Sequence, residues 1–488
     1  MPSPRLKPRT LLRTTILVLV LGSAIGCTDT KHSTDPAGAG GPFGGQGASG
    51  AAGASNSPRN PRTVLDVPID PALLPGAPEA VPLLERASTA EVSCAVAQPL
   101  ELLGMADAVP VQLAGNTWLA HSTSPAADPT GVFLSPVSAD GVVGEAQLFY
   151  DVSSRAPGLR TTRDLQVVAS SERMTLLWTH EVDELGPTGE AAPELLAAQF
   201  GAQGEPLTEP MALSRRRMTV SSVLAVGTAG GLAAIWTETD RTASRTLLRF
   251  ARLDANGELI GTQETLWEQR EHLQAASLTP LGDELLATYS SDAYDADESG
   301  YFSVVLGMDG QQKDARVHLG SFAPTARLVR EERMLAAWTV DHQLPPTAAA
   351  RGSGLESSRA ITVRLGWFDR GGKSIGASYD LQAPVADQRH LAPVLVDLGT
   401  DVAVIWSRGS IVDGPTVAYV PDNQLRLVVL DGTSLTPKSD VLSVPNTRSG
   451  GGLLPVHVQR MGSELFVVAS VHYHADSDLA AVTLHCAP

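Results

Sequence analysis

The chain has 488 residues, of which 43% are hydrophobic and 18% are charged, a length that suits one large domain or several small ones. Its net charge of −17 argues against a nucleic-acid partner and against direct adhesion to anionic lipid head groups. Past residue 26 no run of 18 apolar residues occurs, so we expect no later membrane span.

Residues 1–26 have the parts of a secretory signal peptide: four cations, a short apolar core and then small residues. Residues 24–27, which read AIGC, resemble the lipobox of bacterial lipoproteins, although Leu is the usual first residue there. The resemblance implies that Cys27 is lipid-modified, with palmitate among its acyl chains, and becomes the new N-terminus. Ordinary cleavage near Gly26, leaving a free thiol, is the alternative.

The same resemblance implies an address and a charge for the mature protein. Thr28 follows the modified cysteine, and in lipoproteins a residue other than Asp at this place favours the outer membrane. We therefore expect a lipid-anchored protein of the cell envelope, either periplasmic or surface-exposed. Removal of the four cations in residues 1–26 would take the net charge from −17 to −21.

A tether and an extended segment are expected to follow the anchor. Residues 28–62 are rich in Gly, Ala, Ser, Asn and Pro and lack residues that could form a core, so 27–62 is predicted to be the lipidated Cys and a flexible tether. Residues 63–90 are Pro-rich with scattered Leu and Val. They are predicted to run extended along the folded domain, which we place at residues 91–488.

One short apolar strand motif recurs through the folded domain. The clearest copy, GLAAIWT at Gly231–Thr237, is apolar on both alternating faces, which indicates a strand that is covered on both faces. Each copy places a Ser or Thr after one shared column, and the copies are 49 to 68 residues apart. The shared column holds His121, Trp178, Trp236, Tyr289, Trp338, Trp406 and Ala469.

The surroundings of each copy predict a sheet of about four strands. A β-rich run precedes the motif, and a further strand and an Asp-Gly or Asn-Gly turn, such as 254–257, follow it. Four antiparallel strands per repeat are typical of a β-propeller. We therefore predict an all-β, seven-bladed β-propeller, with six or eight blades possible, whose aromatic column packs between blades. A sandwich array or two separate β domains are the rival folds.

The cysteines suggest how the ring closes. Besides Cys27 the chain has only Cys94 and Cys486, one at each end of the folded region, and in an exported protein this parity favours a disulfide. The last repeat ends one strand early. Residues 92–103 are therefore predicted to pair beside residues 479–486 and to close the propeller by pairing N-terminal and C-terminal strands, with two unpaired thiols as the alternative.

Function is expected on the face where the long, dissimilar loops emerge, because variable loops on a rigid scaffold commonly carry binding. Asp295, Asp297 and Ser299 match the start of a calcium loop. The later position that should hold a bidentate acid is occupied by Leu306. A solvated acidic loop is the competing interpretation. Several histidines near the aromatic column could hold a metal if they converged, namely His121, His180, His342, His472 and His474.

Three functions remain open on the evidence of the sequence, and one of them is a purely structural surface protein. The favoured one is a non-enzymatic lipoprotein whose long-loop face binds or scaffolds a protein or glycan partner. The alternative is a hydrolase or lyase of polysaccharides, for which two carboxylates must lie about 5–10 Å apart. The acids to inspect for that role are Glu181, Glu238, Asp240, Asp292 and Asp341.

Motifs that would identify an enzyme or cofactor site are absent from the sequence. It has no G-x-S-x-G, H-E-x-x-H or P-loop motif, and it lacks the S-x-D-x-G-x-T-W boxes of sialidase-like propellers. We therefore assign no catalytic residue and expect no cofactor, calcium being the one possibility. The lipobox, the Gly/Ala tether and the repeat style together resemble uncharacterised propeller-type lipoproteins of myxobacteria, a resemblance that implies no functional residue.

Overall fold

The computed structural model describes residues 81–123, 130–151, 162–170, 172–182, 192–215, 218–240, 243–269, 272–292, 299–320, 326–330, 333–345, 358–369, 373–410, 423–447, 452–472 and 478–487. This part of the chain is strand, turn and loop, apart from a short 3-10 helix at Leu83–Glu85. Arg62–Pro488 forms one compact unit. The predicted signal peptide, Cys27 and the tether lie outside the described residues.

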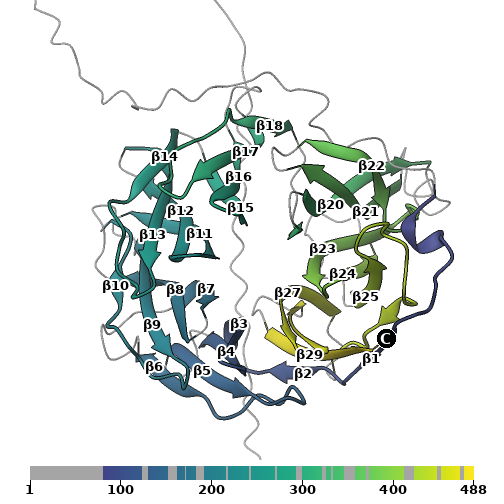
Figure 1. The fold of residues 1–488 in the computed structure, drawn as a ribbon, viewed down its shortest axis with the longest axis horizontal. Coiled ribbons are helices and arrows are strands. Elements are labelled where there is room, and N and C mark those ends of the chain that lie inside the picture. Colours follow the sequence, from purple (N-terminus) through teal and green to yellow (C-terminus); the bar gives the residue numbers. More distant parts are fainter. Residues whose placement is uncertain are drawn as a thin grey trace, which may run out of the picture. The chain divides into compact units, whose positions relative to one another are not determined.

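Four sheets hold four antiparallel strands each, in chain order (Figure 1). The first contains β3 (Met105–Leu113), β4 (Asn116–Thr123), β5 (Gly131–Val137) and β6 (Gln147–Asp151). The second contains β7 (Thr162–Ala169), β8 (Arg173–Val182), β9 (Ala192–Gly201) and β10 (Met211–Ala212). The third contains β11 (Thr219–Thr228), β12 (Gly231–Asp240), β13 (Arg245–Asp254) and β14 (Glu264–Gln269). The fourth contains β15 (Leu273–Leu281), β16 (Glu284–Asp292), β17 (Ser299–Gly307) and β18 (Val317–Gly320).

A fifth sheet joins the two ends of the described chain. It is built from β27 (Gly452–Met461), β28 (Glu464–His472), β29 (Asp478–Ala487), β1 (Ser93–Val96) and β2 (Leu100–Leu102). Both β1 and β2 pair antiparallel with β29. The predicted closure by N-terminal and C-terminal strands is therefore present.

The remaining strands form one eight-stranded sheet. Its members are β19 (Ala326–Arg330), β20 (Arg333–Leu344), β21 (Ser358–Asp369), β22 (Ser374–Asp380), β23 (Gln388–Asp397), β24 (Asp401–Ser410), β25 (Gln424–Asp431) and β26 (Leu442–Ser443). Two antiparallel runs, β19–β22 and β23–β26, are joined where Ile361 of β21 pairs in parallel with Arg389 of β23.

The predicted count of seven blades is wrong. The structure has five separate blades of four or five strands, and the strands expected to make two further blades share this one larger sheet. The physical reason is the pairing of Ile361 with Arg389. It joins the two runs through main-chain hydrogen bonds, which any residue type can make, so the side-chain pattern contains no sign of it. The all-β propeller fold itself is confirmed.

The first strands of successive runs follow one another around the centre of the unit. β3 contacts β7, β7 contacts β11, β11 contacts β15, β15 contacts β19, β19 contacts β23 and β23 contacts β27, and β27 returns to β3. This sequence of contacts makes a closed ring, as Figure 1 shows for the order of the strands. Each sheet therefore has a neighbour on both faces.

The aromatic column lies in the second strand of each run and packs between sheets, as predicted. Trp178 shares a core cluster with Leu134 and Tyr150 of the preceding sheet. Trp406 packs in the same way against Leu335 and Val363. All members of the column are at most 4% exposed: His121, Trp178, Trp236, Tyr289, Trp338, Trp406 and Ala469.

The hairpin turns predicted from Asp-Gly and Asn-Gly pairs contact the preceding sheet. Gly310 has a φ of 74°, and a Cβ there would lie 2.4 Å from the ring of Phe250. Gly257 has a φ of 78° and would meet the side chain of Gln199 at 2.8 Å. Glycine is required at these turns both for the positive φ and for the close approach of one sheet to the next.

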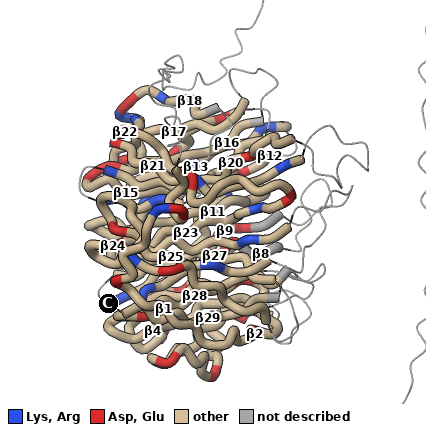
Figure 2. Tube along the Cα trace, turned by 90° about the vertical axis from the view of Figure 1, so that its right-hand side faces the viewer, with Lys and Arg blue, Asp and Glu red and all other residues tan. Residues whose placement is uncertain are grey.

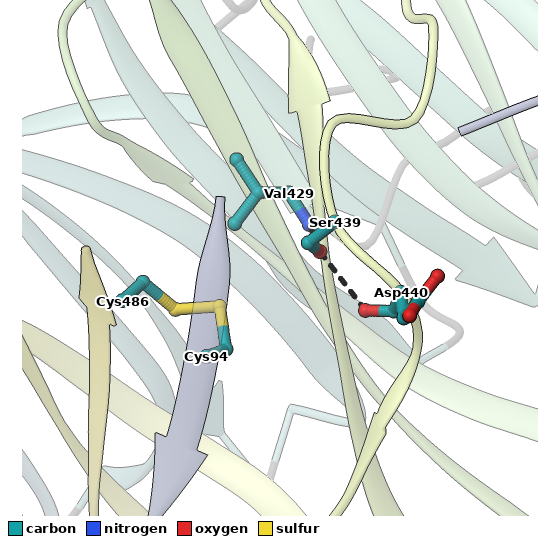
Figure 3. Close-up of a disulfide and its surroundings, with 5 residues drawn as sticks. All are labelled: Cys94, Val429, Ser439, Asp440 and Cys486. Carbon is teal, nitrogen blue, oxygen red and sulfur yellow. Dashed lines mark hydrogen bonds between the residues drawn. A yellow bond between two sulfur atoms is a disulfide. The ribbon is translucent and has the colours of Figure 1, made fainter. Parts of the chain in front are cut away.

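Cys94 and Cys486 form a disulfide between β1 and β29, as predicted (Figure 3). The segment before β1 also holds the ring together. Leu83 is fully buried in the core of the eight-stranded sheet, and Val92 donates its N–H to the carbonyl of Lys438 at 2.9 Å. The N-terminal segment thus spans the gap between the last blade and the eight-stranded sheet.

We predict that loss of the disulfide lowers the free energy of unfolding. The linked cysteines are 392 residues apart, so loop-closure entropy sets an upper limit of about 6 kcal/mol, and native disulfides typically contribute about 2–5 kcal/mol. Urea unfolding of a Cys94→Ser/Cys486→Ser variant should show an earlier midpoint than the parent chain. A Cys27→Ser variant, which keeps the bridge, is the control, and equal midpoints for all three proteins would refute the prediction.

Candidate functional site

The predicted working face is the end of the ring at which β4, β8, β12, β16, β20, β24 and β28 finish, and we call it the long-loop end. Near this end the first strand of most runs carries a β-bulge. In three of the bulges a residue other than glycine takes a positive φ, namely Asp164, Ser222 and Ala392. Bulges interrupt pairing and redirect side chains. These bulges were not predicted from the sequence, because the only sign of them there is a polar residue within a strand, such as Asp107 or Asp164.

Asp107 on β3 joins two neighbouring sheets at the long-loop end. Its carboxylate accepts the N–H of Leu165, the residue after the bulged Asp164, at 2.8 Å. Burial raises the pKa of Asp107 to about 6. The N–H groups of Leu165 and Ala108 lower this pKa, but their effect is smaller than that of burial. Asp164 accepts a hydrogen bond from Thr179 at 3.3 Å. Neither acid was singled out from the sequence.

Glu238 belongs to a buried network and not to an open site. It is fully buried beside Arg249, with Arg249 Nε 3.4 Å from its Oε2 atom. The indole N–H of Trp236 and the main-chain N–H of Arg215 donate to its Oε1 atom at 3.1 and 3.3 Å. Burial lowers the pKa of Arg249, whereas Glu238 raises it. These contacts engage both carboxylate oxygens in fixing Trp236 and Arg249.

The other inspected acids are bound by arginines at strand ends. Asp240 lies opposite Arg245 in the ladder, with Arg245 Nε 3.5 Å from its carboxylate. Asp341 accepts hydrogen bonds from Arg359 at 3.2 and 2.5 Å. Asp240 is the last residue of β12, and Asp341 lies within β20. The side chains of Glu181 and Asp292 lie outside the described residues, and each described member of this set is paired with an arginine.

The histidines are held separately. His121 Nε2 lies 3.1 Å from the hydroxyl of Ser135, His180 Nδ1 lies 3.0 Å from that of Tyr150, and His342 Nε2 lies 2.9 Å from that of Thr362. Among the described residues no group of three or more His, Cys, Asp or Glu side chains could hold a metal. The side chains of His472 and His474 are not described.

The predicted calcium loop falls largely outside the described residues. Asp295 and Asp297 are not described, and Ser299 is the first residue of β17. The calcium hypothesis is therefore untested. The described part of the chain also contains no helix with the length and hydropathy of a membrane span.

Trp267 and Trp367, which the repeat does not account for, pack with arginines. Arg316 lies 4.3 Å from the ring centre of Trp267 and 4.2 Å from that of Phe302, and its guanidinium donates to the hydroxyl of Tyr289 at 3.3 Å. Arg333 lies 4.9 Å from the ring centre of Trp367. Cation–π contacts of this kind stabilise the blades, and they place both tryptophans in structural roles.

Charges of both signs alternate over the side of the ring that Figure 2 shows, along strands and turns. Acidic and basic residues lie close together there. Within the eight-stranded sheet, Arg330 of β19 is paired with Asp397 of β23 at 2.6 Å. The net acidity of the chain is therefore not gathered into one acidic patch on the side shown.

Comparison with known proteins identifies no family. No protein-family profile matches the chain, and no curated protein matches it. A solved sialidase from Trypanosoma rangeli is similar at 9% identity and a TM-score of 0.41 over 78% of this chain and 53% of that one. A prolyl endopeptidase structure gives 11% identity and 0.45 over 77% and 49%. The β-propeller domain of the Trilobed protease from Pyrococcus furiosus gives 10% and 0.34 over 62% and 77%.

These likenesses concern the fold alone. This chain spans about half the length of the sialidase and of the prolyl endopeptidase. The propeller fold is common to unrelated functions.

We predict that Asp107 makes stability depend on pH. Its folded pKa of about 6 is above the ordinary 3.8, so the folded state binds the proton more tightly, and stability falls as pH rises from about 4 to about 6. A two-unit shift corresponds to at most about 3 kcal/mol. Asp107→Asn, which keeps an acceptor for Leu165, should be more stable than the parent at pH 7.5 and equal to it at pH 4. Thermal unfolding across this range measures the difference, and parallel pH profiles would contradict the assignment.

We predict a large loss of stability when Glu238 loses its cation. Arg249→Met leaves a buried carboxylate uncompensated, which costs about 3–5 kcal/mol. Arg245→Met, on the same strand and in an exposed ion pair with Glu268, is the matched control and should cost under about 1 kcal/mol. Urea unfolding compares the two. Similar losses would show that the Glu238 network does not carry the stability assigned to it.

Proposed function

We propose that this protein is a lipid-anchored protein of the cell envelope whose propeller binds a protein or glycan partner at the long-loop end. Cys27 would carry the lipid, and residues 28–62 would hold the propeller away from the membrane. The proposal makes the ring a rigid support and assigns recognition to the strand ends and the loops between them.

The proposal rests on the pairing of the inspected acids with arginines. Glu238, Asp240 and Asp341 are each paired with an arginine. A general acid or nucleophile must be free to reach substrate, whereas ion pairs at strand ends suit a surface that recognises a partner. Asp341 and Arg359 are 43% and 52% exposed, so this pair is available for contact. These features favour binding over catalysis.

A hydrolase or lyase acting on polysaccharide is the second candidate. Asp107 favours it, because a carboxyl group with a pKa near 6 can serve as a general acid at neutral pH. Asp164, on the neighbouring strand, could supply a second carboxylate. Against this role, Asp107 is already engaged by the main chain of Leu165.

The test is crosslinking capture from intact envelopes with variants of the full chain. Asp341→Ala/Arg359→Ala removes one exposed anion and one exposed cation at the long-loop end. It should reduce recovery of the crosslinked partner at least about fivefold, since exposed contacts at a recognition surface contribute about 1 kcal/mol or more. Mass spectrometry of the crosslinked products measures recovery. Cys27→Ser should move the protein out of the membrane fraction and lower capture as well.

Lys313→Ala/Asp314→Ala is the matched control. Both residues are exposed and follow the β17 turn at the opposite end of the ring, and the change in charge is the same. Equal recovery from both double variants would refute recognition at the long-loop end. If Cys27→Ser stayed in the membrane fraction, the anchor would be refuted. Release of reducing sugar from envelope polysaccharide that Asp107→Asn abolishes would establish the hydrolase instead.

A further inference from the structure

Three strands of the eight-stranded sheet bring two arginines and a histidine onto one face near the long-loop end. His390 of β23 is directly opposite Arg408 of β24, and Trp406 of β24 is opposite Arg426 of β25. Residues opposite each other in a ladder, and residues two apart on a strand, point to the same side. The four side chains therefore share the face that Trp406 buries against the β19–β22 run.

The hydrogen bonds of His390 fix which of its ring nitrogens carries the proton. The indole N–H of Trp406 lies 3.0 Å from His390 Nδ1, and an indole can only donate. Nδ1 must then accept, which leaves the proton of the neutral ring on Nε2. His390 is 2% exposed, and its Nε2 atom has no hydrogen-bond partner among the described residues. The interface thus holds a buried donor that has no acceptor in the described part of the chain.

The two arginines lie close enough to each other and to His390 to affect their ionisation. The pKa of His390 is lowered to about 4 by burial and then by Arg408 and Arg426. The pKa of Arg426 is lowered by burial and then by Arg408. Like charges at close range in a partly desolvated interface repel. The repulsion between the two arginines raises the free energy of the folded state, and a bound anion would reduce that repulsion.

The hydrogen bonds of the arginines go to neutral groups. Arg408 donates to Gln388 at 3.2 Å, and Arg426 donates to Gln424 at 3.3 Å. The Nε atom of Arg426 is covered and has no hydrogen-bond partner in the part of the chain that the structure describes. No ion pair of either arginine with a carboxylate occurs within the described residues. Arg408 and Arg426 therefore keep their positive charge, and the atoms that accept their hydrogen bonds are neutral amide oxygens.

The acids of the facing run are bound elsewhere. Asp341 of β20 lies on the same side as Leu335 and Ala337 by strand alternation, but Arg359 binds it. Asp380 is bound by Arg364 at 2.7 and 3.1 Å. Each of these acids is neutralised by its own arginine. Within the described part of the chain no carboxylate therefore compensates the charge of Arg408 and Arg426, in a protein whose net charge is −17.

We propose that Arg408, Arg426 and the Nε2–H of His390 form a binding site for an oxyanion, such as the phosphate or carboxylate group of a ligand. Two guanidinium groups present parallel N–H donors that match the oxygens of such a group. The histidine N–H supplies a third donor from the buried side. The inference goes beyond the proposed function, because the site needs no macromolecular partner.

Calorimetric titration of the purified protein with inorganic phosphate and with acetate tests the site. The parent chain should bind one of the two anions at a single site. Arg408→Gln/Arg426→Gln should weaken binding at least about tenfold, since a charge-assisted hydrogen bond contributes about 1.5–3 kcal/mol. Stronger binding of phosphate would identify a phosphate-type ligand, and stronger binding of acetate a carboxylate. Arg245→Gln, at the long-loop end of another blade, is the control and should bind like the parent.

A second measurement keeps the proposal testable if the double variant does not fold. The ring N–H signal of His390 in ¹⁵N-histidine NMR spectra of the parent chain should shift on addition of the bound anion, because the anion accepts that proton. Absence of binding by the parent to either anion would overturn the proposal. Equal affinities of the parent and the double variant, or an unmoved His390 signal at saturation, would do the same.

Discussion

Burial of both faces of every sheet is the constraint on which the structure depends. The second strand of each run is apolar on both sides, as in β12, where residues 232–237 are all buried. A single sheet of this kind would expose two apolar faces to water, at a cost of about 25 cal/mol for each Å². A ring in which each sheet covers the next removes this exposure, and the aromatic side chains between sheets fill the space. The functional surfaces exist because the ring holds the strand ends in place.

Such a ring must close, and the ends of the chain close it. β1 and β2 complete the last blade by pairing with β29, and the disulfide links the two termini covalently. Leu83 extends the same closure to the eight-stranded sheet. Contacts made by residues far apart in the chain form late in folding and have a high entropic cost, which gives a covalent link between the ends a clear physical role.

The sequence was sufficient for features that depend on side-chain type. The aromatic column, the glycine turns and the Cys94–Cys486 bridge all follow from residue chemistry, and the structure contains them. The count of seven blades failed because the pairing of Ile361 with Arg389 is a main-chain contact with no side-chain pattern. The arginine partners of the acids to inspect were not predicted, for another reason. These partners, such as Arg245 opposite Asp240, are set by strand register, which becomes certain only once the strand length is known.

The same distinction explains what was missed at the long-loop end. Asp107 and the arginine–histidine group acquire their properties from burial and from neighbours on other strands. Arg408 and Arg426 are 18 positions apart in the chain and share a face only through the ladder of β24 and β25. Single-sequence patterns report on one strand at a time. Interactions between strands therefore have to be read from the fold.

Hydrogen exchange in increasing urea, followed by mass spectrometry of peptides from the second strands, tests the central claim most directly. If each sheet is stable only because its neighbours cover it, peptides from β4, β8, β12, β16, β20, β24 and β28 should lose protection together, in one transition. Loss of protection in one sheet at a clearly lower urea concentration, with the others still protected, would show that the sheets are stable independently and would contradict the account.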